Sequence, residues 1–225
     1  MQRYANLYVI GTSHISKESV KEVEATITNL KPEIIAIELD KQRLQALLNK
    51  TPQKISLAQI KALGLKGFLF SIIGSYLQKK LGKMVGIEPG SEMKKAIVLA
   101  KKFKIKLALI DQDIGITLKR LSKRITFKEK MRFLKEIILS PFSREKIKID
   151  LNKVPEKELI VKLEAKLKED YPSVYLTLIE ERNVIMAKSL NKLMKDYKSI
   201  IAVVGAGHEE DIIQLIKNDI HKKRD

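Results

Sequence analysis

The chain is organised around the stretch IIAVVGAGH at residues 200–208. Its first five residues are apolar and mostly β-branched, which is typical of a strand covered on both faces. A similar pattern occurs near the start of the chain in LYVIGTSH at residues 7–14, where an apolar run is again followed by Gly-x-x-His. Gly11 and His14 therefore match Gly205 and His208, and the sequence predicts two strands that each bring a histidine to the edge of a sheet.

The composition is that of a folded globular protein. The chain has 225 residues, of which 44% are hydrophobic and 32% are charged, enough for one substantial core. It has no cysteine, which excludes disulfides, thiolate metal ligands and a cysteine nucleophile. The N-terminal residues carry no secretory signal pattern, so we expect a cytoplasmic protein without a transmembrane segment.

The formal net charge of +17 leaves three interpretations open. The residues 119–168 hold 16 basic and 7 acidic side chains, so the excess is concentrated there. This pattern fits a solvated helical surface, contact with an anionic membrane surface, or nucleic acid. Aromatic side chains that would stack on bases are sparse in this region, which makes nucleic acid the weakest of the three.

Apolar runs alternate with helical patterns along the chain. Runs at 7–10, 34–37, 105–110 and 200–204 predict strands, and Ser16 and Ser91 are expected to cap two of the helices between them. The sequence thus predicts a single α/β domain over 1–225, with a mainly parallel central sheet flanked by helices. A helical insertion is expected at about 114–170.

A second apolar helical segment is expected at about 55–85. Its most apolar part, residues 63–73, is too short to cross a bilayer and is interrupted by Lys66. We expect this segment to bury its apolar face in the core or in a homodimer interface, the alternative being an amphipathic segment at a membrane surface.

One late helix places charged residues inside its apolar stripe. Glu181 and Arg182 fall among residues such as Leu178, Ile185 and Met186 at helical spacing. Burying either charge alone is costly, so the two are expected to form an ion pair, bind a ligand or line a polar cavity.

Polar residues follow each predicted strand. They are His14, Glu38, Asp40, Asp111, Asp113 and His208. The carboxyl ends of parallel strands share one edge, where α/β proteins bind ligands. Two imidazoles with one or two carboxylates are a ligand set for Zn²⁺, Mn²⁺, Co²⁺ or Fe²⁺, although a histidine at a strand end is often only hydrogen-bonded.

Two other kinds of site are disfavoured by the same residues. A dinucleotide site is disfavoured because the third glycine of its motif is missing, and a Ser-His-Asp triad is disfavoured because no Gly-x-Ser-x-Gly turn is present.

Several motifs together resemble the TraB/PrgY family. They are GTSHISKES at 11–19, IELD at 37–40 followed by Arg43, GSEM at 90–93, LIDQDI at 109–114 leading to TLKR at 117–120, EERN at 180–183 followed by MA at 186–187, and VVGAGH at 203–208. That family is related to the Tiki proteins, described as metal-dependent proteases with two Gly-x-x-His motifs, and more loosely to ChaN-like and erythromycin-esterase-like proteins. Many of its members continue into a membrane-embedded C-terminal region.

The resemblance implies roles for individual residues. It places His14 and His208 at a metal or catalytic centre and matches Glu38, Arg43, Glu181 and Arg182 to the family's glutamate and arginine positions. Two departures lie beside this centre: Gln112 stands where the family usually has an arginine, and Glu209-Glu210-Asp211 replaces a more apolar continuation.

The sequence therefore predicts a metal-dependent hydrolase that cleaves a peptide, such as a signalling pheromone. His14, His208 and Glu38 would hold a divalent transition metal, Glu38 or Glu181 would act as ligand or base, and Arg43 or Arg182 would stabilise the oxyanion. Gly11, Gly205, Asp111 and Asp113 would line the site. The alternatives are a non-catalytic protein that sequesters a peptide or small signalling molecule, and a basic protein that associates with the membrane surface.

Overall fold

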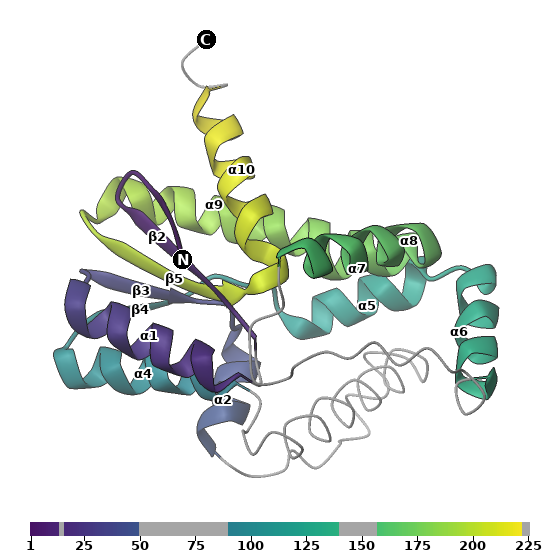
Figure 1. Ribbon diagram of the computed structural model, residues 1–225, viewed down its shortest axis with the longest axis horizontal. Helices are drawn as coiled ribbons and strands as arrows, with labels where there is room; N and C mark the ends of the chain where they lie inside the picture. Colours follow the sequence, from purple (N-terminus) through teal and green to yellow (C-terminus); the bar gives the residue numbers. More distant parts are fainter. Residues whose placement is uncertain (14–15, 50–89, 140–156, 222–225) are drawn as a thin grey trace.

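A computed structural model describes residues 1–13, 16–49, 90–139 and 157–221 (Figure 1). Within these ranges the chain forms a five-stranded sheet with helices on both of its faces. The strands are β1 (Gln2–Tyr4), β2 (Leu7–Thr12), β3 (Ile34–Ile37), β4 (Lys106–Leu109) and β5 (Ile200–Gly205). The predicted α/β class is confirmed.

The strand order is β1-β2-β5-β3-β4, and every pairing except that of β1 with β2 is parallel. The two strands that carry the Gly-x-x-His motifs are therefore direct neighbours, with Gly11 opposite Val204 and Thr12 opposite Gly205. The short antiparallel strand β1 adds an edge to the sheet that the sequence did not predict.

The alternation of side chains along the strands divides the core into two layers. On one face, Ala202 and Val204 pack with the helices α9 (Glu181–Asp196) and α10 (Ala206–His221). On the other, Ile201 and Val203 pack with α1 (Lys17–Leu30) and α4 (Ser91–Phe103). Because β5 is buried on both faces, its continuous apolar sequence has a direct structural cause.

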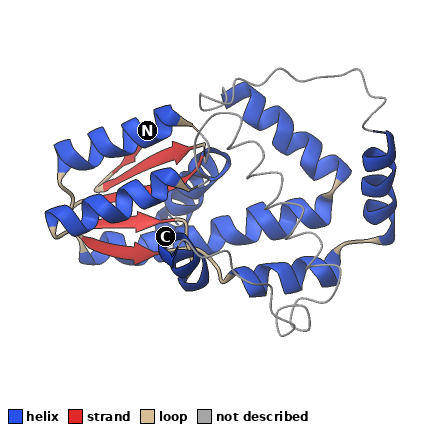
Figure 2. Ribbon diagram, turned by 90° about the horizontal axis from the view of Figure 1, so that it is seen from below, coloured by secondary structure: helices blue, strands red, loops and turns tan. Residues whose placement is uncertain are grey.

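The helices that lie beyond the sheet gather at one end of the molecule (Figure 2). Apart from a two-residue link at 125–126, the described residues between 114 and 170 are helical, and they form α5 (Ile114–Arg124), α6 (Phe127–Leu139) and α7 (Lys157–Asp170). The short helix α8 (Pro172–Tyr175) and a π-helix, η2 (Leu176–Glu180), lead into α9. The helix α2 (Lys41–Asn49) follows β3.

The helix caps agree with the sequence in one case and differ in another. Ser16 caps α1, accepting hydrogen bonds from the backbone N–H groups of Glu18 and Ser19. Ser91 was predicted to cap α4, but the cap is Gly90, whose φ of 81° lies in the left-handed region open to glycine.

Two sequence predictions fall outside the described residues. These are the apolar helical segment at 55–85, with its homodimer interface at 63–73, and the placement of His14. Within the described ranges, no helix combines the length and the apolar character needed to cross a membrane.

Candidate functional site

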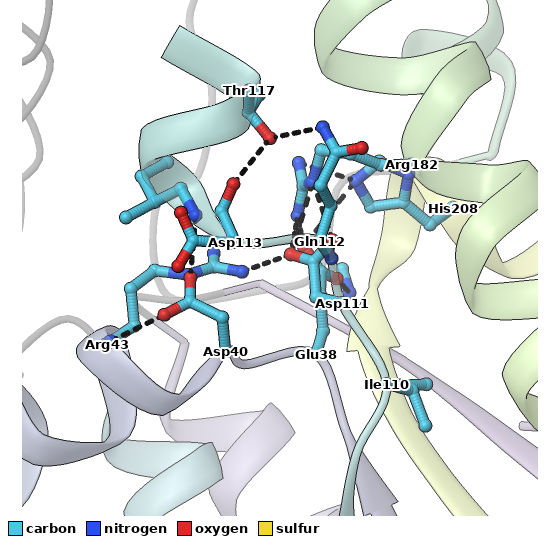
Figure 3. A network of polar contacts seen from close by, with 12 residues as sticks. Glu38, Asp40, Arg43, Ile110, Asp111, Gln112, Asp113, Thr117, Arg182 and His208 are labelled. Atoms are coloured by element: carbon cyan, nitrogen blue, oxygen red, sulfur yellow. Dashed lines mark hydrogen bonds and ion pairs between the residues drawn. The ribbon is translucent and has the colours of Figure 1, made fainter. Parts of the chain in front are cut away.

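The carboxyl ends of the parallel strands carry a buried cluster of charged side chains (Figure 3). Glu38 follows β3, Asp111 follows β4 after Ile110, and His208 follows β5. The strands run in the same direction, so these three residues meet at one edge of the sheet, as the sequence predicted.

Arg182, in the first turn of α9, holds this cluster together. Its Nη2 donates to Asp111 Oδ2 at 2.7 Å and also to Glu38 Oε1, while its Nε lies 3.1 Å from Asp111 Oδ1. Its Nη1 donates to the Leu178 carbonyl at 3.0 Å, within the π-helix η2. Burial alone would lower the pKa of Arg182, but the two carboxylates outweigh it and raise that pKa, so the guanidinium stays charged.

Glu38 connects the cluster to the centre of the sheet. The residue is 4% exposed, and its Oε2 accepts a hydrogen bond of 2.6 Å from the Gly205 backbone N–H at the end of β5. Its other oxygen binds Arg182. Both oxygens are therefore engaged, which is what a buried carboxylate requires.

His208 lies in the first turn of α10 with its ring oriented by Asn183. The Asn183 amide donates to Asp211 Oδ2 at 3.0 Å, which turns the Asn183 carbonyl oxygen toward His208 Nδ1 at 2.6 Å. The Asn183 oxygen accepts, so we infer that Nδ1 carries a proton. Nε2 faces Nη1 of Arg182, which is a donor, so a lone pair on Nε2 is the group that matches this contact. Nε2 lies 3.3 Å from Arg182 Nη1 and 3.5 Å from Glu38 Oε1.

Arg43 forms a second ring of contacts around Asp111. Its Nε donates to Asp40 Oδ2 at 2.8 Å, and its Nη2 donates to Asp111. Asp40 also accepts from the backbone N–H groups of Gln42 and Ile114, which join the first turns of α2 and α5. Arg43 and Arg182 both donate to Asp111 Oδ2, so Arg43 helps to fix the orientation of the carboxylate that binds Arg182.

The residues after Asp111 lead into α5. Asp113 caps this helix by accepting from the backbone N–H groups of Gly115 and Ile116, and it receives the Gln42 side chain at 2.9 Å. Gln112 is buried and donates to the Thr117 hydroxyl at 2.8 Å. Asp113 therefore starts α5 and also ties it to α2 through Gln42, while Gln112 bonds to α5.

Glu181 does not join the cluster, although it precedes Arg182 directly. It pairs with Arg120 at 3.2 Å and with Arg124, both on α5. Burial would raise the pKa of Glu181, but these two arginines outweigh it and lower that pKa. The structure thus assigns Glu181 to the contact between α5 and α9.

The two glycines of the motifs lie at this edge for a reason that the sequence analysis missed. Neither Gly11 nor Gly205 has a positive φ, so neither is required by a left-handed backbone conformation. A Cβ at Gly11 would lie 2.3 Å from Glu209 Oε2 and 3.2 Å from Ala206 Cα, so β2 passes close to the start of α10. Gly205 donates its N–H to Glu38.

Asn183 is a site residue that the sequence analysis did not select. It is 1% exposed and forms an i, i+3, i+4, i+7 stripe with Met186, Ala187 and Leu190. A polar residue in a fully buried stripe must be hydrogen-bonded, and this signal could have identified it.

Within the part of the chain that the structure describes, no group of three or more histidine, aspartate or glutamate side chains could hold a metal ion. His14, the third expected ligand, is outside that part. Of the predicted ligands, Glu38 and His208 are brought together.

The fold and this cluster define an α/β domain with a buried charged site at the carboxyl ends of its parallel strands. The chain belongs to the TraB/PrgY/gumN family, which it matches over residues 3–218. An uncharacterized protein of Methanocaldococcus jannaschii is 44% identical over 216 residues, which cover 94% of this chain and 53% of that relative. A TraB domain-containing protein of Homo sapiens is 24% identical over 245 residues, covering 96% of this chain and 64% of the relative. This chain therefore spans between about half and two thirds of these curated relatives.

Proposed function

We propose that this chain is a hydrolase domain that cleaves a peptide bond at the cluster of Arg182, Glu38, Asp111 and His208. One observation carries the proposal: the oriented imidazole of His208 directs Nε2 toward a charged guanidinium at 3.3 Å, at the ligand-binding edge of the sheet. An imidazole lone pair beside a fixed positive charge supplies the two groups that acyl transfer needs, a base or ligand and an oxyanion partner.

The spacing of His208 and Glu38 is compatible with a divalent metal ion. Two ligands at about 2.1 Å from one tetrahedral ion lie roughly 3.4 Å apart, and His208 Nε2 and Glu38 Oε1 are 3.5 Å apart. His208, Glu38 and His14 would hold the ion, with Glu38 giving up part of its contact to Arg182. A metal ion there would polarise the substrate carbonyl and lower the pKa of a water molecule.

The remaining residues would hold the site in place. Asn183 fixes the tautomer of His208, as partners behind metal-bound or catalytic histidines do. The side chain of Asp111 is fully buried and holds Arg182 and Arg43 together, so the guanidinium of Arg182 is presented in one orientation. Arg182 would then stabilise negative charge that develops on the substrate oxygen.

Sequestration of a peptide without cleavage is the second candidate. It is favoured by the fact that Glu38 and Asp111 are both neutralised by arginine side chains. A carboxylate held by a guanidinium is a weaker base and a weaker metal ligand than an unpaired one.

Cobalt titration of untagged protein would test the metal. Co²⁺ has visible absorption bands that report ligand number, and the three histidines of the chain allow matched variants. His14→Ala and His208→Ala should each abolish stoichiometric binding, while His221→Ala should retain it. Binding that survives both of the first two substitutions would remove the metal from the proposal.

Cleavage is tested separately with a defined mixture of synthetic peptides, with products identified by mass spectrometry. Turnover that is lost in His208→Ala and in Arg182→Lys but kept in His221→Ala supports the hydrolase. Peptide binding that depends on Arg182 without any product supports sequestration instead.

A further inference from the structure

Helix α6 stands at the end of the molecule away from the sheet (Figure 1). One of its faces is fixed to the neighbouring helices. Glu129 accepts a hydrogen bond of 2.8 Å from the Ser173 backbone at the start of α8, and Arg132 donates to the carboxylate of Asp170, the last residue of α7, at 2.6 Å. These contacts determine which side of α6 faces outward.

The outward side combines apolar and basic residues. Phe127 is 76% exposed, the highest value among the large hydrophobic side chains that the structure describes, and Met131 follows one turn later at 38%. Lys135 continues the same stripe, because positions four residues apart share a helix face, and Lys128 lies beside it. Both lysines are exposed. We refer to Phe127, Lys128, Met131 and Lys135 as the α6 patch.

We propose that the α6 patch docks on the surface of an anionic lipid bilayer. An exposed phenylalanine gains free energy by entering the boundary between headgroups and acyl chains, and lysines beside it meet the anionic headgroups. Lysine stems also cover apolar surface while their ammonium groups stay in water. The two kinds of side chain are therefore complementary to the two layers of a bilayer surface.

The charge of the chain favours a bilayer over a second copy of the protein. Each chain has a formal net charge of +17, so a symmetric contact through the α6 patch would bring like charges together. Single-stranded nucleic acid is bound by several aromatic side chains in succession. Among described residues, the outward stripe of α6 presents Phe127 as its aromatic side chain, with Phe133 on a different face.

A single tryptophan tests insertion directly, since the natural chain has none. In Phe127→Trp, the emission should shift to the blue on addition of vesicles of phosphatidylcholine with phosphatidylglycerol, and should not shift with phosphatidylcholine alone. Val98→Trp is the matched control, because Val98 is 55% exposed and lies on α4, a helix that packs against the sheet and is not part of the α6 patch. An equal shift in both variants, or none in Phe127→Trp, would overturn the proposal.

Charge reversal tests whether the patch or the total charge is responsible. One lysine near an anionic surface strengthens partitioning about fivefold, so Lys128→Glu with Lys135→Glu should weaken vesicle binding by about 25-fold or more. Lys101→Glu with Lys102→Glu makes the same change in charge on α4, where both lysines are exposed, and should weaken it much less. Equal losses of vesicle binding in the two double variants would show that only the net charge matters and would overturn the proposal. Tight binding of a short RNA that quenches the tryptophan emission of Phe127→Trp would also overturn it and would assign the α6 patch to nucleic acid.

Discussion

Arg182 and Glu181 are adjacent in the sequence, yet they serve two different regions. Arg182 lies in the buried cluster with Glu38 and Asp111, and its side chain is 14% exposed. Glu181 pairs with two arginines of α5 whose side chains are 50% and 40% exposed. The number of ion pairs is similar in the two regions, so burial decides how much each of them contributes to stability.

Removing the buried guanidinium should have the largest effect. Arg182→Met leaves the carboxylates of Glu38 and Asp111 without a major partner, and we expect it to lower the free energy of unfolding by about 3–5 kcal/mol. Urea denaturation at neutral pH measures this loss. A variant with Arg182→Met and Glu38→Gln together should recover part of it, because one of the unpaired charges is then absent.

If Arg182→Met lowers the free energy of unfolding by less than about 1 kcal/mol, the buried ion pairs contribute no more than surface pairs do. The matched control is Arg120→Met, which removes an exposed arginine from the Glu181 pair. If both variants lose the same free energy of unfolding, burial does not determine how much these ion pairs stabilise the fold.

Glu129 tests an intermediate case, a buried carboxylate among the outer helices. Its two oxygens accept hydrogen bonds from Thr126 and from Ser173, so Glu129→Gln turns an N–H₂ group toward a donor. We expect a loss of about 1.5–3 kcal/mol at pH 7. Circular dichroism during urea unfolding measures this loss, with Glu169→Gln at an exposed position of α7 as the control.

The loss in Glu129→Gln should depend on pH. Burial would raise the pKa of Glu129, but the hydrogen bonds from Thr126 and Ser173 outweigh it and lower that pKa. A carboxylate with a lowered pKa stabilises the fold fully above the unfolded pKa of about 4.3, and this contribution disappears as the pH falls through the folded pKa. The difference between wild type and Glu129→Gln should therefore shrink below about pH 4, and a difference that grows with acid would reverse the assignment.

The smallest effect is expected at Glu181. Glu181→Gln removes a carboxylate that is itself 16% exposed, but its partners Arg120 and Arg124 are 50% and 40% exposed, so water screens the pairs and the loss of stability should be roughly 0–1 kcal/mol. Because the pKa of Glu181 is also lowered, this small contribution is present at neutral pH and lost in acid. Cobalt binding should be unchanged, and a loss of binding would return Glu181 to the site.

The strands and their edge could be predicted from sequence because they depend on local patterns. Continuous β-branched runs identify β3 and β5 as buried strands, and the polar residues that follow them must share an edge when the strands are parallel. The strand order could not be predicted in this way, and the structure shows that β2 pairs directly with β5, which places Gly11 opposite Val204.

The sequence could not predict the separation of Glu181 from Arg182. A helical stripe assumes 3.6 residues per turn, but Leu176–Glu180 form a π-helix, which changes the phase between Tyr175 and α9. The apolar residues before α9 therefore do not show which of the two adjacent charged residues faces the sheet. The close approach of Gly11 to Glu209 could not be predicted for a similar reason, since the two residues are 198 positions apart in the sequence. Contacts of this kind depend on packing between elements and leave no periodic signal.

The position of β5 has a consequence for how the protein folds. This strand is the last of the described strands in sequence order but lies between β2 and β3, so the pairs β1-β2 and β3-β4 are joined into one sheet only through β5. During synthesis, the two pairs can be joined only after residue 205 has left the ribosome. Long segments separate β2 and β3 from β5 in the sequence, so the pairing of β5 with these strands is expected to be slow. The edges of β2 and β3 that pair with β5 stay unpaired during this interval, which makes completion of the sheet the step most open to chaperone binding and aggregation.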